Sequence, residues 1–177
     1  MSDQLTINPA GPDQAELIAD LSRSTFYDTF AADNTAEDMD LFMNEQFTKA
    51  SLEAEVGKEG LAFFIAWLGT DPVGYLKLNS LPGRADFLPG ATNPIELSRI
   101  YTVKHCIGKG VGAGLLKKAF DFAQAHQHDW IWLGVWEKNT RAIGFYRHHG
   151  FERVGQQVFI LGNDPQTDWI MARQVNC

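Results

Sequence analysis

The sequence predicts an α+β fold with a mixed sheet of about seven strands, and three observations support this prediction. The chain has 177 residues, which is enough for one domain with a full core and short for two. Its first third shows apolar residues at helical spacing, whereas later segments are rich in β-branched and aromatic residues. The elements follow the order helices, hairpin, strand, helix, strand, helix and hairpin, which is typical of an α+β domain.

The first elements are a short strand and three helices. Residues 4–10 are β-like, and Asp13 is expected to cap the helix that follows. A second helix is expected over residues 35–47, because Thr35 can cap it and acidic residues occupy its first turn. A third, short helix is expected near residues 49–60.

The middle of the chain changes to a β pattern. Residues 61–80 contain two β-rich runs separated by Gly-Thr-Asp-Pro, which predicts a hairpin. Residues 81–94 hold three prolines and two glycines and are expected to form a loop. The next strand is expected over residues 95–103, directly before a loop with four glycines.

The second half alternates helices and strands before it ends in another hairpin. Apolar residues from Val111 to Ala123 recur at helical spacing. The run WIWLGVW is too apolar for a one-sided surface strand, so it should be central in the sheet. Asn139 and Gly150 are expected to begin and end the last helix. The last two strands are expected over residues 155–164 and 166–175.

Composition and charge exclude several classes of protein. The net charge of −7 argues against nucleic acid or an anionic membrane as the main partner. No apolar run approaches the roughly 20 residues that span a bilayer, and the first residues lack the pattern of a signal peptide. The two cysteines do not suggest a disulfide framework. We therefore expect a reduced, cytoplasmic protein that does not bind membranes or nucleic acid.

The glycine-rich loop before the helix at Val111 is suited to phosphate, because bare main-chain N–H groups and a helix N-terminus attract anions. It is not a P-loop, since glycine rather than Ser or Thr follows Lys109. Gly108, Gly110 and Ala113 formally match the dinucleotide-binding fingerprint. That fingerprint needs an acidic residue at the end of the next strand, whereas Asp129 precedes the strand.

A third interpretation uses the segments around the loop. IELSRIYTV, CIGKGVG and EKNTRAIGFYRHHGF resemble the GNAT superfamily of acyl-coenzyme A transferases. Gly110 and Gly112 stand at the two glycine positions of a signature similar to [QR]-x-x-G-x-[GA], with Ile107 where Gln or Arg is usual. The segment from Asn139 to Phe151 is similar to the superfamily helix N-x-x-A-x-x-F-Y-x-x-x-G-F.

Longer segments resemble one branch of that superfamily more closely. ELSRIYTV, WIWLGVWEKNTRAIGFYRHHGF and VFILGNDPQTDWIM look like the Pai-type bacterial polyamine (spermidine) acetyltransferases. The resemblance implies one GNAT-type domain over residues 1–177, with a mostly antiparallel sheet, flanking helices and a splayed central parallel pair. It implies transfer of acetyl from acetyl-CoA to a primary amine such as spermidine. A sensor that binds acetyl-CoA without turnover, or an acetyltransferase for an amino acid or peptide N-terminus, are the alternatives.

The resemblance also implies how acetyl-CoA is held. Tyr101, Thr102 and Val103 are expected to pair with the pantetheine arm, and loop amides to face the pyrophosphate. Asn139 is expected to bond to pantetheine, to cap its helix, or both. The residues expected to contact the cosubstrate are Tyr101, Thr102, Val103, Ile107, Gly108, Lys109, Gly110, Val111, Gly112, Asn139 and Tyr146.

Amine acetylation needs a base for the amine and an acid for the departing thiolate. Tyr146 is expected to be that acid, because it lies two helical turns after Asn139. Glu96 is expected to be the base, acting through a water chain with Ser98, since a strand's period of two would place both on one face with Ile100. Glu137, at the end of the central strand, is the alternative base.

The acceptor is expected to be a small-molecule amine. Tyr27, Asp28 and Phe30 are expected on one wall of its pocket, with Trp136 and Glu137 on the other, because the two acids suit a cationic amine. Surface Trp and Phe residues suggest a homodimer. None of the five histidines pairs with Cys or acid at zinc spacing, so we expect no metal.

Overall fold

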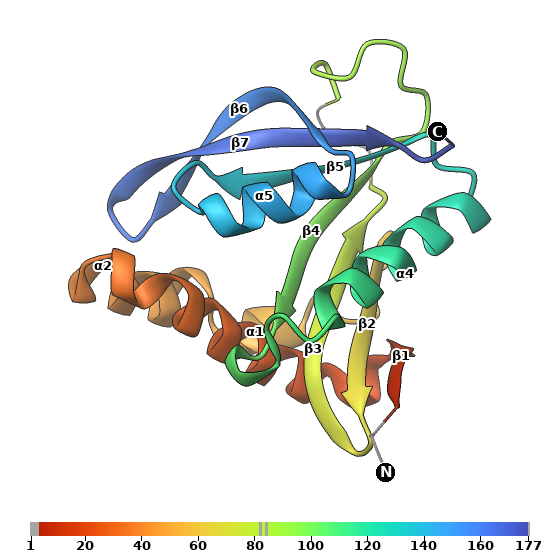
Figure 1. Ribbon diagram of the computed structural model, residues 1–177. Helices are drawn as coiled ribbons and strands as arrows, with labels where there is room; N and C mark the ends of the chain where they lie inside the picture. The colour runs from red at the N-terminus through yellow and green to blue at the C-terminus, as the bar shows by residue number, and fades with distance from the viewer. Residues whose placement is uncertain (1–3, 82, 84, 177) are drawn as a thin grey trace.

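The computed structural model describes residues 4–81, 83 and 85–176, so positions 82 and 84 of the predicted loop lie outside the described residues. It contains one seven-stranded sheet in the order β1-β2-β3-β4-β5-β7-β6, shown in Figure 1. Among the strand pairs of the described residues only β4–β5 is parallel, so the predicted α+β class with a mixed sheet is confirmed. The strands are β1 Leu5–Ala10, β2 Leu61–Leu68, β3 Asp71–Asn79, β4 Ile95–Thr102, β5 Trp130–Trp136, β6 Glu152–Leu161 and β7 Asp164–Gln174.

Helices cover both faces of the sheet. The largest apolar cluster joins α4 and α5 to the strands, and two smaller clusters join α1–α3 to the opposite face. Figure 1 shows α4 lying across β2, β3 and β4. Among the described residues, no helix is both long and apolar enough to cross a bilayer. The helices are α1 Ala15–Phe30, α2 Ala36–Leu41, which continues as a π turn over Phe42–Gln46, α3 Lys49–Glu53, α4 Val111–Ala125 and α5 Thr140–His148.

Two of the three predicted helix caps are confirmed. The Thr35 hydroxyl accepts the Asp38 amide at 3.1 Å, and the Asn139 side chain accepts the Ala142 amide at 3.1 Å. The cap predicted at Asp13 is wrong, because Asp13 lies inside a 3-10 turn that precedes α1. Pro12 occupies the first position of that turn, where its fixed φ favours helical geometry two residues earlier than predicted.

The central parallel pair opens almost at once. β4 and β5 are in register only at Ile95 with Ile131 and at Glu96 with Trp132. Beyond these positions the strands diverge, which confirms the predicted splay. Main-chain groups along one edge of β4 therefore have no neighbouring strand, and the opening can admit a ligand.

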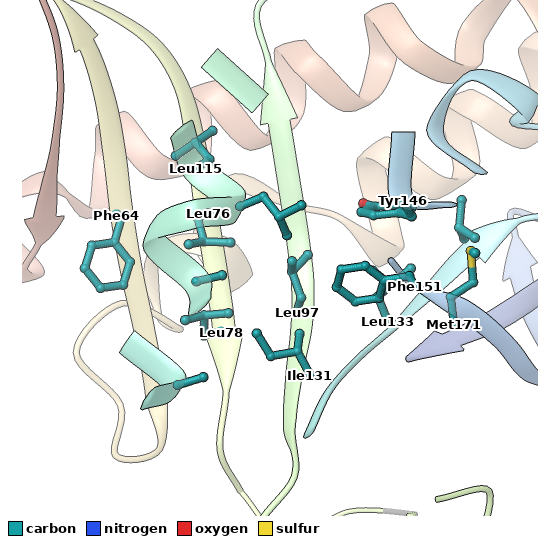
Figure 2. Close-up of a cluster of buried hydrophobic side chains, with 14 of the residues drawn as sticks. Phe64, Leu76, Leu78, Leu97, Leu115, Ile131, Leu133, Tyr146, Phe151 and Met171 are labelled. Atoms are coloured by element: carbon teal, nitrogen blue, oxygen red, sulfur yellow. The ribbon is translucent and has the colours of Figure 1, made fainter. Parts of the chain in front are cut away.

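The core lies beside this opening. Ile131, Leu133 and Val135 are buried along β5, as expected for the predicted central strand. Figure 2 shows side chains from β2, β3 and β4 gathered on one side and those around Phe151 and Met171 on the other. Both groups belong to one apolar cluster, which therefore joins the two halves of the sheet.

The basis of the homodimer prediction needs correction. The large apolar side chains that are exposed in the described part of the chain include no Trp or Phe. Phenylalanine residues instead form buried ring clusters between α1, α2 and the π turn. The large apolar side chains that are exposed in this part of the chain are Tyr27, Leu81, Ile107, Val158 and Ile160.

Candidate active site

Two cavities adjoin at the opening between β4 and β5. The inner cavity, of about 320 Å³, is lined by Phe26, Phe30, Phe42, Gln46, Phe47, Leu97, Ser98, Arg99, Ile100, Tyr101, Gly134, Val135, Trp136, Asn139, Ala142, Tyr146, Phe159, Leu161, Gln166 and Asp168. The loop cleft, of about 360 Å³, is lined by Thr29, Ile100, Tyr101, Thr102, Cys106, Ile107, Gly108, Gly110, Gly112, Ala113, Asn139, Arg141, Ala142, Phe145 and Tyr146.

The residues that line both cavities mark the junction between the inner cavity and the loop cleft. They come from β4, from α5 and from the residue that caps α5. Because these side chains face both spaces, a ligand in the loop cleft can reach a ligand in the inner cavity. The shared residues are Ile100, Tyr101, Asn139, Ala142 and Tyr146.

The glycine loop forms one end of the cleft. Gly108 and Gly110 have φ of +82° and +84°, a conformation that side chains disfavour. No described atom lies within 4 Å of a Cβ built at either position, so conformation rather than space requires glycine there. Gly110 also begins α4, whose first-turn amides have no intrahelical partner. These amides and the helix dipole suit a phosphate.

The main-chain hydrogen bonds around β4 contradict the predicted contact between Val103 and pantetheine. The Val103 amide donates to the Val73 carbonyl at 2.9 Å, and its own carbonyl accepts from Cys106 at 2.9 Å. Val103 therefore cannot pair with pantetheine. Because main-chain groups alternate along a strand, Tyr101 also faces β3, whereas Thr102 and Ile100 face the opening. The main-chain groups of Thr102 therefore face the opening, as predicted for a pantetheine contact. Those of Ile100 do so as well, which the sequence analysis missed.

The other residues predicted to contact the cosubstrate divide into two groups. Most line the loop cleft, namely Ile107, Gly108, Gly110, Gly112, Asn139 and Tyr146. The Lys109 side chain is exposed outside both cavities, and the Val111 side chain is buried in the core. Arg141, which sequence reasoning missed, lines the cleft and brings a positive charge that Ile107 lacks.

Tyr146 is the aromatic residue of α5 that lines both cavities. It is 7% exposed, and Phe145 and Phe151 pack edge-on against its ring. Figure 2 shows its hydroxyl at the end of the ring directed toward β4. Burial raises the pKa of the phenol well above its ordinary value. Tyr146 therefore stays protonated at neutral pH and can act as a proton donor.

Asp168 is a candidate that sequence reasoning missed. It lies on β7 and lines the inner cavity. Burial raises the pKa of its carboxyl group to about 6, and none of the ion pairs between described residues involves it. Gly134 on β5 leaves room for it, since a Cβ there would lie 3.3 Å from Asp168 Oδ2. The sequence did contain a signal for Asp168, because it is an acidic residue inside the apolar strand TDWIM.

Neither predicted base reaches the junction. Glu96 lies outside both cavities, where its Oε2 accepts from the Asn79 side chain at 3.2 Å. The prediction that Glu96, Ser98 and Ile100 share a face is wrong, because the register with β3 shifts and leaves Ser98 as a β-bulge. Glu137 is exposed just beyond β5 and also lies outside both cavities.

The residues predicted to bind the acceptor are only partly brought together. Phe30 and Trp136 meet edge to face at 6.0 Å between ring centroids and line the inner cavity. Asp28 lies outside the inner cavity but lines an adjoining recess together with Phe30 and Trp136, and that recess also contains Lys104 and Lys138. Tyr27 is 52% exposed and lies outside the cavities. Of the residues predicted to bind the acceptor, Phe30 and Trp136 therefore line the inner cavity, and acceptor binding by them stays a prediction. Among the described residues, no group of His, Cys, Asp or Glu could hold a metal ion.

A buried ion cluster lies behind the inner cavity. Arg99 Nη1 and Nη2 donate to Glu55 at 2.7 and 3.2 Å, and Lys77 Nζ lies 3.1 Å from the same carboxylate. The adjacent cations lower the pKa of Glu55 despite the opposing effect of its burial. Arg99 belongs to the cavity wall, whereas Glu55 and Lys77 stand behind it.

Comparison with known proteins agrees with this geometry. Residues 20–151 match the model of the acetyltransferase (GNAT) family. The uncharacterized N-acetyltransferase in the pepI 3′ region of Lactobacillus delbrueckii subsp. lactis is 36% identical over 165 residues, 91% of each chain.

Two solved structures share the fold. PaiA N-acetyltransferase from Thermoplasma acidophilum in complex with coenzyme A has a TM-score of 0.78 at 20% identity, over 97% of this chain and 99% of that one. YncA from Salmonella typhimurium with its cofactor acetyl-CoA has a TM-score of 0.72 at 16% identity, over 98% and 95%. At these identities the two structures show that the fold is shared. The chain belongs to the acetyltransferase (GNAT) family, whose members are N-acetyltransferases that use acetyl-CoA.

Proposed function

We propose that the chain transfers acetyl from acetyl-CoA to a primary amine by direct attack at the junction of the two cavities. The observation that carries this proposal is the position of Tyr146, which faces the loop cleft and the inner cavity at once. Acetyl-CoA occupies the cleft and the amine enters from the inner cavity. The thioester carbon then lies where both reactants can meet.

The cleft supports the donor through its main chain. Amides of Gly110, Gly112 and neighbouring loop residues face the pyrophosphate at the start of α4. Ile100 and Thr102 offer main-chain groups to the pantetheine arm, in the manner of an added strand. Arg141 supplies a cation near the phosphates.

The inner cavity supports the acceptor through Asp168. An alkylamine has a pKa near 10.4, so only about one molecule in a thousand is neutral at pH 7. Asp168 is mostly ionised at that pH and accepts the proton that the amine loses, directly or through water. Glu96 lies outside this cavity, which favours Asp168 as the base.

Tyr146 supports the departure of the thiol. As the amine nitrogen forms its bond to the carbonyl carbon, the carbon–sulfur bond breaks and leaves a thiolate. The Tyr146 hydroxyl donates its proton to that sulfur and recovers one from solvent. Because burial raises the pKa of this phenol, it keeps its proton until a thiolate forms beside it.

The decisive experiment measures release of free coenzyme A thiol with a panel of amines. The panel includes spermidine, the acceptor that the sequence predicts, together with other amines, amino acids and peptides. Turnover with at least one amine is expected. Tight binding of acetyl-CoA without turnover of any amine would instead indicate the sensor that the sequence left open.

Two other sequence predictions remain proposals. A homodimer is supported by Val158 and Ile160, which are 69% and 49% exposed on the edge strand β6. Light scattering after gel filtration decides it, because a monomer at all concentrations would contradict a dimer. A cytoplasmic location is checked by fractionation of cells that produce the protein.

A further inference from the structure

We propose that the acceptor amine also carries a carboxylate or a similar anionic group on an apolar or aromatic body, as amino acids do. This inference rests on the proposed function, because it concerns the acceptor in the same inner cavity. It depends on Arg99, which faces that cavity from β4.

The Arg99 guanidinium has more N–H donors than its observed hydrogen bonds use. Its guanidinium carries five N–H groups, and Glu55 engages one on each terminal nitrogen. Among the described residues, the structure shows no other hydrogen-bond partner for this side chain. The side chain is 18% exposed and packs over the Phe47 ring at 5.0 Å, which fixes it against the wall. An anion in the cavity would therefore meet an oriented guanidinium.

Arg99 shares its carboxylate partner on this wall. Glu55 binds both Arg99 and Lys77, whereas Glu96 acts on Lys77 and lies outside the cavity. A guanidinium that shares its carboxylate in a desolvated place favours an additional anion. A ligand carboxylate bound to Arg99 supplies it.

Apart from Arg99, the residues that line the inner cavity include one group that can bind a cation. Asp168 is the other charged residue among the described residues that line the cavity, and it receives the amine in the proposed reaction. Both amide atoms of the Gln46 side chain already bond to the Gly162 main chain, at 3.1 and 3.2 Å. Gln166 donates to Asn34 and Asp164. Between Arg99 and Asp168 the walls are mainly aromatic and suit an apolar body.

A polyamine fits this arrangement less well. Its further ammonium groups would lie among aromatic rings, which attract cations. However, Arg99 already covers the Phe47 ring, and its charge opposes a second cation nearby. The charges thus favour a zwitterion with one amine over a chain with several.

Matched pairs of acceptors test the inference. Thiol release is measured with phenylalanine and phenethylamine, with leucine and 3-methylbutylamine, and with spermidine. The carboxylate-bearing member of each pair should have the higher kcat/KM. Arg99→Met should reduce this preference by about 10- to 100-fold, since a hydrogen bond to a charged group is lost. Lys77→Met removes the other cation on Glu55 from outside the cavity and should keep the preference.

A binding measurement separates this inference from the proposed function. Calorimetry in the presence of coenzyme A compares N-acetylphenylalanine with N-phenethylacetamide, and the first should bind more tightly to the wild-type chain. Equal binding, a preference for spermidine, or an unchanged preference in Arg99→Met overturns the inference while acetyl transfer stands. Absence of turnover with every amine contradicts the proposed function, and calorimetry still decides this inference. If Arg99→Met does not fold, the kcat/KM values of the matched acceptor pairs with the wild-type chain decide the inference.

Discussion

Asp168 on β7 is the register partner of Trp136, the last residue of β5, and both side chains line the inner cavity that Tyr146 also faces. β5 has by then diverged from β4, so Asp168 faces the cavity at the opening. Its carboxyl group is desolvated and has no counter-ion among the described residues, which explains its raised pKa. An acid in this position can exchange a proton with an amine near pH 7.

Asp168→Asn should therefore remove the base and lower kcat/KM by about 10²- to 10⁴-fold. In the wild type, log kcat/KM should bend near pH 6, with steeper dependence below, because Asp168 must be ionised to act. The variant should lack the bend. Profiles of thiol release between pH 5 and 8 check this, and a bend that persists in the variant would assign it to another group.

The same substitution should increase stability at neutral pH. The folded pKa of Asp168 lies above its ordinary value of 3.8, so the destabilisation develops as pH rises above that value and is complete once pH exceeds about 6. Asn avoids this cost, and with allowance for partial exposure the gain is about 1 to 2 kcal/mol. The gain should disappear below pH 4, where Asp168 is protonated in both states. Urea unfolding at pH 7.5 and pH 3.5 measures it, and an equal difference at both values would contradict the assignment.

Tyr146→Phe should lower kcat by at least about 10²-fold and leave binding of coenzyme A nearly unchanged. Phe fills the same space, so the core around Phe151 is retained. Thiol-release kinetics and calorimetry with coenzyme A give the two values. Tyr27→Phe is the control, because Tyr27 is exposed and lies outside the cavities. An equal loss of activity in both variants would remove Tyr146 from the proposed role.

Features fixed by neighbouring residues could be predicted from the sequence. The caps at Thr35 and Asn139 depend on contacts three residues away, and both are present. The splay of β4 from β5 followed from the family resemblance, and its register agrees.

Features set by contacts distant in sequence could not be predicted. The bulge at Ser98 arises from pairing with β3, and it changes which face Glu96 shares. Asp168 becomes a candidate only because β7 pairs with β5 at the opening. The raised pKa of its carboxyl group depends on that burial, and no spacing in the sequence encodes it.

Gly110→Ala should weaken binding of coenzyme A. The φ of +84° costs a residue with a side chain about 1 kcal/mol, although the space for a Cβ is open. The loop is then expected to shift its amides away from the pyrophosphate. Gly144→Ala is the matched control, because Gly144 lies inside α5 with open space around it and Ala favours helix there. Calorimetry should show weaker binding for the first variant alone.

Glu55→Gln should destabilise the fold by about 3 kcal/mol, because it leaves Arg99 and Lys77 without a buried anion. The lowered pKa of Glu55 means that its contribution is present above about pH 4.5 and is lost as pH falls further. The variant should lack this acid-dependent loss. Glu16→Gln, which disrupts only the exposed pair with Lys49, should change stability little. Urea unfolding at pH 7 and pH 3 measures both, and similar values for the two variants would mean that the ion cluster contributes little to folding.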